Sequence, residues 1–291
     1  KLLHICADDT KTYNKNAEYT VNGGNYETST NFVYVGAYRV GTMNLNNVTA
    51  STTEASKSPT VHVNSITLNI TGGTYTQNGN YSVLLYYAPK VETTGERDLA
   101  TATIKNASLI SYHGVVQDKT KWYYESAVML SCGVRATLEN CTVKSLGKKI
   151  DGKQVTVGYA VGIDGGAECI ITGDNGYYST IDANVISIAT DNAYGRLTIN
   201  GGTFTMEDMT VSAARSLVWN AGGVTTINGG NFTMPKFKVE NNGVMIGGGK
   251  GSAVQQTTFV INGGNYFANN NTDATVSADG ADITINGGYF T

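Results

Sequence analysis

The chain has 291 residues, of which 41% are hydrophobic and 15% are charged, and it contains 35 Gly but only 3 Pro. A formal net charge of -3 excludes a broadly basic nucleic-acid surface, and no run of about 18 apolar residues is present to span a membrane. The 9% of aromatic residues supply apolar surface that a disordered linker lacks. Gly, Asn, Thr and Tyr dominate where a helix would need Ala, Leu and Glu, so the composition indicates an all-β protein.

A six-residue motif recurs along the chain. It begins with an apolar residue, continues with Asn-Gly-Gly or a related turn, and ends with an aromatic or aliphatic residue. The ten copies start about 29 residues apart, a period typical of solenoids. Complete copies occupy 21–26, 70–75, 199–204, 227–232, 261–266 and 285–290, and degenerate copies occupy 45–50, 104–109, 138–143 and the segment from 171.

Short apolar alternations lie between the motifs, for example at 128–130, 161–163, 186–188 and 244–246. A period of two over so few residues predicts strands with one face inward. Two or three strands per repeat, with no helical segment between them, predict a right-handed parallel β-helix of about ten coils, because right-handed crossings are favoured between parallel strands. The repeats cover residues 1–291 as a single domain, and we expect it to be part of a longer chain.

Two columns of residues follow from this register. The last motif position should form an apolar stack in the interior, and we expect its rings to point inward beneath the Gly-Gly turn. The residue before each motif is usually Thr or Asn, and these should form an outward ladder of hydrogen-bonded side chains. The rings of the first column are Tyr26, Tyr75, Phe204, Phe232, Tyr266 and Phe290.

Steps such as Leu138-Glu139-Asn140-Cys141-Thr142-Val143 resemble those of the right-handed parallel β-helix (pectin-lyase-like) superfamily of pectate lyases, polygalacturonases and bacterial surface proteins. The Asn-Gly-Gly-x-aromatic version is similar to repeats of secreted proteins of gut bacteria. The resemblance implies the fold and an extracellular or outer cell-surface location, and it leaves the activity open. Cys132, Cys141 and Cys169 fall in different columns, so we expect thiols that fill the core and no disulfide. Cys6 fits a first-coil strand better than it fits a lipid-anchored cysteine.

Long insertions at 86–101, 111–126 and 145–159 flank one strand column over coils three to five, and a fourth lies at 249–258. Insertions on one face of a solenoid commonly mark its binding side. We therefore expect a groove in which rings stack on sugar and a charged group fixes its orientation. The alternative is that the aromatic residues only pin their loops to the β-helix. The residues expected at the walls are Tyr86, Tyr87, Arg97, Trp122, Tyr123 and Tyr124, and those expected on the floor are Ser131 and Asp164.

Catalytic signatures are weak. Asp164 is the one clear outward carboxylate expected on the floor, with Ser131 and about Ala189 as its column neighbours, whereas a glycoside hydrolase needs a pair of carboxylates. The sequence shows no cluster of carboxylates of the kind that binds calcium. His4, His62 and His113 are scattered in the sequence, so no metal site, cofactor or His-based triad is predicted.

Three functions remain open. The first is an adhesin-like module that binds a polysaccharide or glycoprotein surface without catalysis. The second is a polysaccharide lyase or glycoside hydrolase acting in the groove, with catalytic residues that the sequence does not reveal. The third is ice binding by a flat Thr-x-Asn face, against which Lys105 and Glu139 and the irregular coil lengths argue. The oligomeric state is not predicted.

Overall fold

The structure is a computed structural model of the whole chain. It describes residues 1–5, 16–36, 41–79, 81–88, 100–113, 126–147, 149–150, 153–154, 159–180, 185–188, 195–206, 216–234, 243–249, 256–268, 272–278 and 280–291. Within these ranges the regular elements are strands, and no helix is present that could cross a membrane.

Three ten-stranded sheets, named A, B and C in chain order, run side by side along the molecule. Each strand of sheet A pairs in parallel with the strands one coil before and one coil after it, except that the first and the last strand have one such partner. The strands of sheet A are β1 (Leu3–Ile5), β4 (Val33–Val35), β7 (Val61–Asn64), β10 (Leu84–Tyr87), β13 (Val128–Ser131), β18 (Val161–Asp164), β21 (Val185–Ile188), β24 (Val218–Ala221), β27 (Gly243–Gly248) and β30 (Thr272–Ala278).

Sheets B and C are likewise parallel throughout. The strands of sheet B are β2 (Glu18–Asn22), β5 (Thr42–Asn46), β8 (Thr67–Thr71), β11 (Thr101–Lys105), β14 (Arg135–Glu139), β19 (Glu168–Thr172), β22 (Arg196–Ile199), β25 (Val224–Ile227), β28 (Thr258–Ile261) and β31 (Asp282–Ile285). The strands of sheet C are β3 (Asn25–Thr28), β6 (Thr49–Thr52), β9 (Thr74–Gln77), β12 (Ser108–His113), β15 (Thr142–Gly147), β20 (Tyr177–Thr180), β23 (Thr203–Met206), β26 (Asn231–Thr233), β29 (Asn265–Phe267) and β32 (Tyr289–Phe290).

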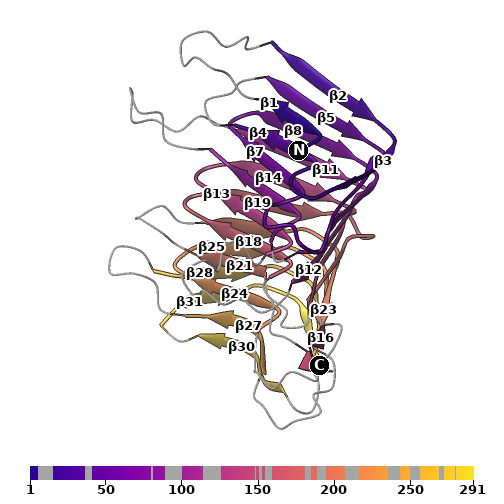
Figure 1. Cartoon of the computed structure of the whole chain (residues 1–291). Coiled ribbons are helices and arrows are strands. Elements are labelled where there is room, and N and C mark those ends of the chain that lie inside the picture. The colour runs from indigo at the N-terminus through magenta and orange to yellow at the C-terminus, as the bar shows by residue number, and fades with distance from the viewer. Residues whose placement is uncertain are drawn as a thin grey trace.

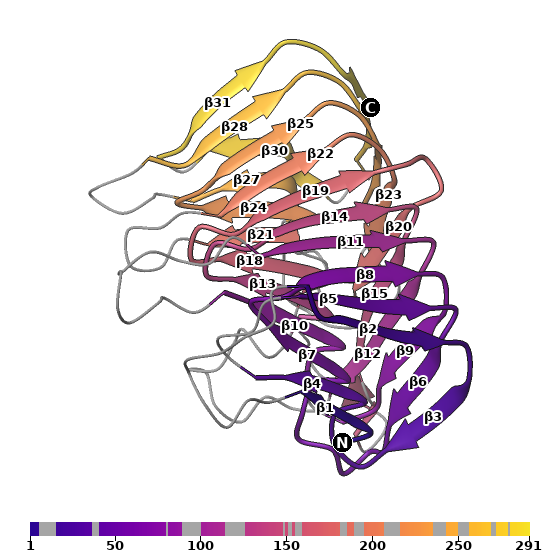
Figure 2. The same cartoon turned by 90° about the horizontal axis from the view of Figure 1, so that it is seen from above.

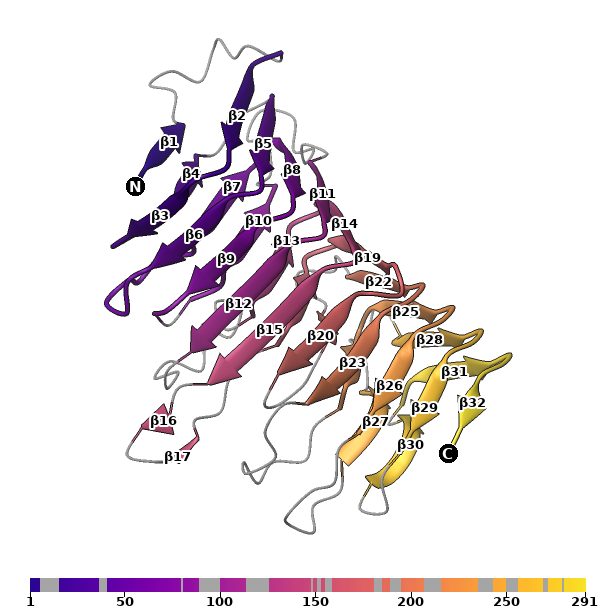
Figure 3. The ribbon, with the colours of Figure 1, turned by 90° about the vertical axis from the view of Figure 1, so that its right-hand side faces the viewer.

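Each coil passes through sheets A, B and C in turn before the chain enters the next coil. Figures 1 and 2 show the ten coils stacked between the two ends of the chain, winding as a right-handed helix. The predicted all-β parallel β-helix is confirmed. Among the described residues there is one further sheet, a small antiparallel hairpin of β16 (Lys149–Ile150) with β17 (Lys153–Gln154), which projects from the sheet C side in Figure 3.

The turn between sheets B and C explains the repeated motif. In most coils its second residue is a glycine with positive φ, such as Gly230 (φ 114°) or Gly24 (φ 94°). A Cβ on Gly230 would lie 3.3 Å from the ring of Phe232, so the missing side chain leaves the space that the ring occupies. The glycine is therefore required both by the backbone conformation and by the ring beneath the turn.

Three coils form the turn between sheets B and C with an asparagine in place of a glycine. Asn47, Asn106 and Asn140 adopt the left-handed conformation at φ 51–52°, which Asn tolerates better than most residues. A buried residue then fills the place of the ring, and the inward position two residues later carries a smaller side chain. These buried pairs are Val48 with Ala50, Ala107 with Leu109, and Cys141 with Val143.

The inward column of sheet C is the predicted apolar stack, and the prediction is confirmed. Successive ring centroids from Tyr178 through Phe204, Phe232 and Tyr266 to Phe290 are 4.6–5.0 Å apart, with interplanar angles of 7–13°. Tyr178 supplies the ring in coil six, where the sequence motif slips. Tyr75 is also fully buried, Tyr26 stacks on Phe32 at 5.0 Å, and the pairing places Ala50, Leu109 and Val143 in the same column.

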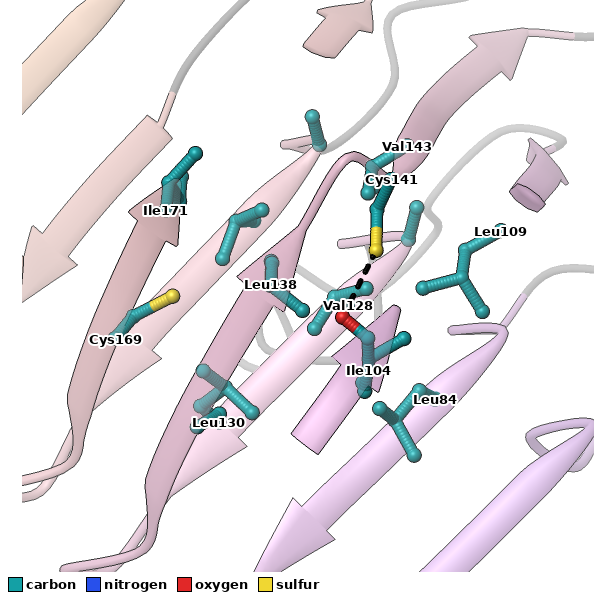
Figure 4. Packing of buried hydrophobic residues seen from close by; sticks show 14 of the residues in the cluster. Leu84, Ile104, Leu109, Val128, Leu130, Leu138, Cys141, Val143, Cys169 and Ile171 are labelled. Atoms are coloured by element: carbon teal, nitrogen blue, oxygen red, sulfur yellow. Dashed lines mark hydrogen bonds between the residues drawn. The ribbon is translucent and has the colours of Figure 1, made fainter. Parts of the chain in front are cut away.

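Aliphatic residues of all three sheets meet in the middle of the β-helix (Figure 4). Cys141 and Cys169 are buried among them, and the Cys141 thiol donates to the carbonyl oxygen of Ile104 at 3.2 Å. Burial raises the pKa of Cys141 to about 11, so the thiol stays protonated. Cys132, in a turn, is only partly buried, and all three are free thiols as expected. Cys6 lies outside the described residues.

Candidate functional site

The outer face of sheet A carries the side chains that point away from the core. In β7, Val61 and Val63 are buried in the interior, whereas His62 lies on the opposite, outer side of the strand. The pairing places His4, Tyr34 and His62 at equivalent positions of three successive coils. The outer face of sheet A therefore begins with a column of aromatic and imidazole rings.

These rings contact one another along the column, which we call the outer ring column. The centroid distances are 5.0 Å between His4 and Tyr34, 4.9 Å between Tyr34 and His62, and 5.7 Å between His62 and Tyr87 of the next coil. The first two contacts are edge-to-face, with interplanar angles of 72° and 81°. The Lys1 ammonium lies 4.3 Å from the centroid of the Tyr34 ring, so a cation already uses the face of that ring.

Polar atoms accompany the rings in coil three. His62 Nε2, Asn64 Oδ1 and Ser65 Oγ are buried and have no hydrogen-bond partner among the described residues. Burial, and secondarily the charge of Lys1, lowers the pKa of His62 to about 4, so the imidazole is neutral at physiological pH. Buried polar groups without partners are rare in proteins and cost free energy until a water or ligand satisfies them.

Two tyrosines expected at the groove wall lie within β10, which extends from Leu84 to Tyr87 and is longer than the apolar alternation indicated. The predicted wall position of Tyr86 is wrong. Its ring is fully buried in the core, where its hydroxyl donates to the carbonyl oxygen of Ile66 at 2.7 Å, and burial raises its pKa well above the ordinary value. Tyr87 lies on the outer side, partly exposed, as the last member of the outer ring column.

Ser131, which was expected on the floor beside Asp164, occupies the position next to Tyr87 in the following coil. Asp164 lies at the end of β18 and pairs with Ile188, one position from the expected neighbour Ala189. The expectation of an accessible floor carboxylate is wrong, because Asp164 is only 6% exposed. The remaining predicted wall residues, Arg97, Trp122, Tyr123 and Tyr124, lie outside the described residues, so the groove itself remains a prediction.

The sequence reading of the histidines as scattered is wrong for two of them. His4 and His62 are 58 positions apart but occupy one column, separated by Tyr34. His113 belongs to a different sheet, where it pairs with Gly147. The signal was available in the alternations Leu3-His4-Ile5, Val33-Tyr34-Val35 and Val61-His62-Val63, in which each ring stands between two inward aliphatic residues.

The outer face of sheet B is polar, and many of its side chains are paired with one another. Asn228, Asn262 and Asn286 each donate from the amide nitrogen to the amide oxygen of the preceding Asn at 2.8 Å. The pairing places the predicted Thr and Asn residues in one column, which Ile170 and Val260 interrupt. In its first coils Asn69 donates to Asn44 at 2.9 Å and Asn44 donates to Thr20 at 3.3 Å.

Ion pairs cross the same face of sheet B. Lys105 Nζ lies 2.7 Å from Glu139 Oε2, and Arg135 Nε lies 3.2 Å from Glu168 Oε2. These charges interrupt the Thr-x-Asn surface that ice binding would require. Among the described residues, no group of three or more His, Cys, Asp and Glu side chains is arranged to hold a metal ion.

Comparison of the chain with known protein families, with curated proteins and with solved structures finds no match.

Proposed function

We propose that the protein is an extracellular or cell-surface β-helix module that binds carbohydrate, and that the outer ring column is its binding site. The observation that carries the proposal is the column itself, in which His4, Tyr34, His62 and Tyr87 form a continuous row of partly exposed rings on the outer face of one sheet. Aromatic rings with a few fixed polar groups are the usual composition of a small-ligand site.

The chemistry of the column matches a sugar. Ring faces accept the apolar C–H face of a pyranose, as the face of Tyr34 already accepts the Lys1 ammonium. His62 and Asn64 place polar side chains on the same side of β7. The neutral imidazole avoids placing a buried charge beside an uncharged ligand. A pectin-lyase-like ancestry and the surface location belong to the same proposal.

The test is a glycan array, followed by calorimetry on the glycans that bind, for the wild-type chain and Tyr34→Ala. We expect this variant to weaken binding at least about tenfold, because central aromatic side chains dominate most interfaces. Tyr177→Ala is the matched control, since Tyr177 is also partly exposed and has the Lys144 ammonium 5.0 Å from its ring centroid, but lies on sheet C. Equal losses in the two variants, or none in either, would contradict the proposal.

The competing function is polysaccharide cleavage. A hydrolase or lyase of this fold needs accessible acid and base groups, whereas the described floor carboxylate Asp164 is buried. A reducing-end assay on pectins and mucin glycans separates the two functions. Turnover that is lost in Asp164→Asn would replace the binding proposal with an enzymatic one.

A further inference from the structure

Four turns in the C-terminal half of the chain share the sequence Ile-Asn-Gly-Gly directly after the last residues of a sheet B strand. Their asparagines are exposed, and each of the last three donates from its amide nitrogen to the amide oxygen of the asparagine one coil before it, at 2.8 Å. We call this hydrogen-bonded row the Asn-Gly column. Its members are Asn200, Asn228, Asn262 and Asn286.

The stacking of coils requires the glycine that follows each of these asparagines. A Cβ on Gly229 would lie 2.8 Å from the carbonyl oxygen of Asn200, and a Cβ on Gly263 would lie 2.6 Å from that of Asn228. The φ angles of these two glycines lie outside the left-handed region, so the close approach of the preceding coil, and not the backbone conformation, excludes other residues. The fold therefore keeps an Asn-Gly step in each of these coils.

An Asn-Gly step is chemically labile, because asparagine deamidates and no side chain on glycine hinders the reaction. The glycine nitrogen attacks Cγ of the asparagine side chain, the bond from Cγ to the amide nitrogen breaks, and ammonia leaves with the proton of the glycine nitrogen. The succinimide ring that forms is opened by water at either carbonyl, which leaves aspartate or isoaspartate. The attack requires the two reacting atoms to approach within about 3.5 Å in a suitable orientation.

The hydrogen bonds of the column oppose this approach. Asn262 donates to Asn228 and accepts from Asn286, so its amide cannot turn toward the nitrogen of Gly263 without breaking both bonds. Each bond that must break should slow the reaction about two- to tenfold. The row also has a direction, because every amide nitrogen donates to the coil before it and an aspartate in its place could accept but not donate.

We infer that the Asn-Gly column is a deamidation site that its own hydrogen bonds slow, and that conversion of one asparagine speeds the reaction in the preceding coil only. Once position 262 carries a carboxylate, Asn228 Oδ1 loses its donor and faces a charged oxygen instead. Asn286 keeps an acceptor for its amide nitrogen, so its own protection is unchanged. Deamidation therefore spreads along the column toward the N-terminus, one coil at a time.

The first experiment compares the folded chain with the chain unfolded in guanidinium chloride, both at mildly alkaline pH. Peptide mass spectrometry follows the mass gain at each Asn-Gly step as OH replaces NH2. The four steps have the same flanking residues, Ile before and Gly-Gly after, so they should react alike when unfolded. In the folded chain Asn228 and Asn262 should react at least about fourfold more slowly than when unfolded. Equal rates in the two states would overturn the protection.

The second experiment tests the direction with two variants of one position. Asn262→Asp should speed deamidation of Asn228 about two- to tenfold and leave that of Asn286 unchanged. Asn262→Ala removes the acceptor as well as the donor, so it should speed both neighbours. Asn265→Asp is the matched control, because Asn265 lies in the same coil but donates to Asn231 on sheet C at 2.9 Å.

Thermal unfolding of each variant shows whether it is folded, and Asn262→Ala still tests the column if the charged variant does not fold. An unchanged rate at Asn228 in the folded variants of position 262 would overturn the inference. Equal acceleration of Asn228 and Asn286 in Asn262→Asp, or acceleration of Asn228 in Asn265→Asp, would overturn the directional spread.

Discussion

Two columns of rings run along this β-helix, one inside and one outside. The inner column on sheet C stacks Phe204, Phe232 and Tyr266 almost parallel and almost completely buried. The outer ring column on sheet A joins His4, Tyr34 and His62 through edge-to-face contacts and leaves them partly exposed. The same coil-to-coil spacing produces both columns.

The difference shows how one repeat supports two roles. Inward rings are fixed by the glycine turn above them and by rings on both sides, so their burial contributes to stability. Outward rings lie on the outer face of sheet A, and their removal leaves the core unchanged. We therefore expect substitutions in the inner column to affect folding and substitutions in the outer column to affect binding.

The largest effect should follow Phe232→Ala. It removes a fully buried ring from the middle of the inner column, and such truncations cost about 3 to 5 kcal/mol of unfolding free energy. Denaturant unfolding measures the loss, and glycan binding by the folded fraction should not change. Tyr34→Ala is the outer counterpart, with an expected cost below about 1 kcal/mol. A cost below about 0.5 kcal/mol for Phe232→Ala would show that the inner column is not a core.

The outer column should make stability depend on pH through His62. Its pKa is about 4 in the folded chain, against about 6.5 when unfolded, so the unfolded chain binds the proton first as the pH falls. Stability is therefore full above about pH 6.5 and decreases by about 2 to 3 kcal/mol as the pH falls to about 4. His62→Gln should lack this decrease, so the difference in stability between wild type and variant should change by about 2 to 3 kcal/mol over this pH range. Parallel stability curves for the two proteins would refute this role of burial.

The third prediction compares a glycine turn with an asparagine turn. Gly230→Ala places a Cβ 3.3 Å from the Phe232 ring at a φ of 114°, so we expect a loss of about 1 to 3 kcal/mol. Asn47→Gly is the matched substitution at an asparagine corner, where φ is 52° and glycine fits, and it should change stability by less than about 0.5 kcal/mol. Thermal unfolding of both variants measures the contrast. Similar losses at the two corners would show that ring packing does not select the glycine.

The smallest effect distinguishes two tyrosines within the inner column. The Tyr178 hydroxyl is buried and has no partner in the part of the chain that the structure describes, whereas the Tyr266 hydroxyl donates to the carbonyl oxygen of Gly263 at 2.8 Å. Tyr178→Phe should stabilise the protein by about 1 kcal/mol, and Tyr266→Phe should destabilise it by a similar amount. Chemical denaturation of the two variants measures both changes in the free energy of unfolding. Destabilisation by Tyr178→Phe would mean that its hydroxyl makes a useful hydrogen bond.

Local sequence determined most of the fold because most coils repeat the same turn. Asn-Gly-Gly followed by an aromatic residue encodes the turn and the inner ring together, so the rings of those coils could be predicted, whereas Tyr178 was missed because the motif slips in coil six. The candidate site was harder, because His4 and Tyr34 meet only after pairing across coils that differ in length. Tyr86 was misplaced because β10 extends two residues further than the apolar alternation, which turns its side chain inward.

The central claim is that ligand contacts the outer face of sheet A, and hydroxyl-radical footprinting with mass spectrometry tests it most directly. The chain is oxidised with and without the polysaccharide that binds it most tightly. The account predicts that Tyr34, His62 and Tyr87 are protected in the complex, while Tyr177 and Phe267 on sheet C react as in the free chain. Protection of the sheet C residues, with Tyr34 and Tyr87 unchanged, would contradict it.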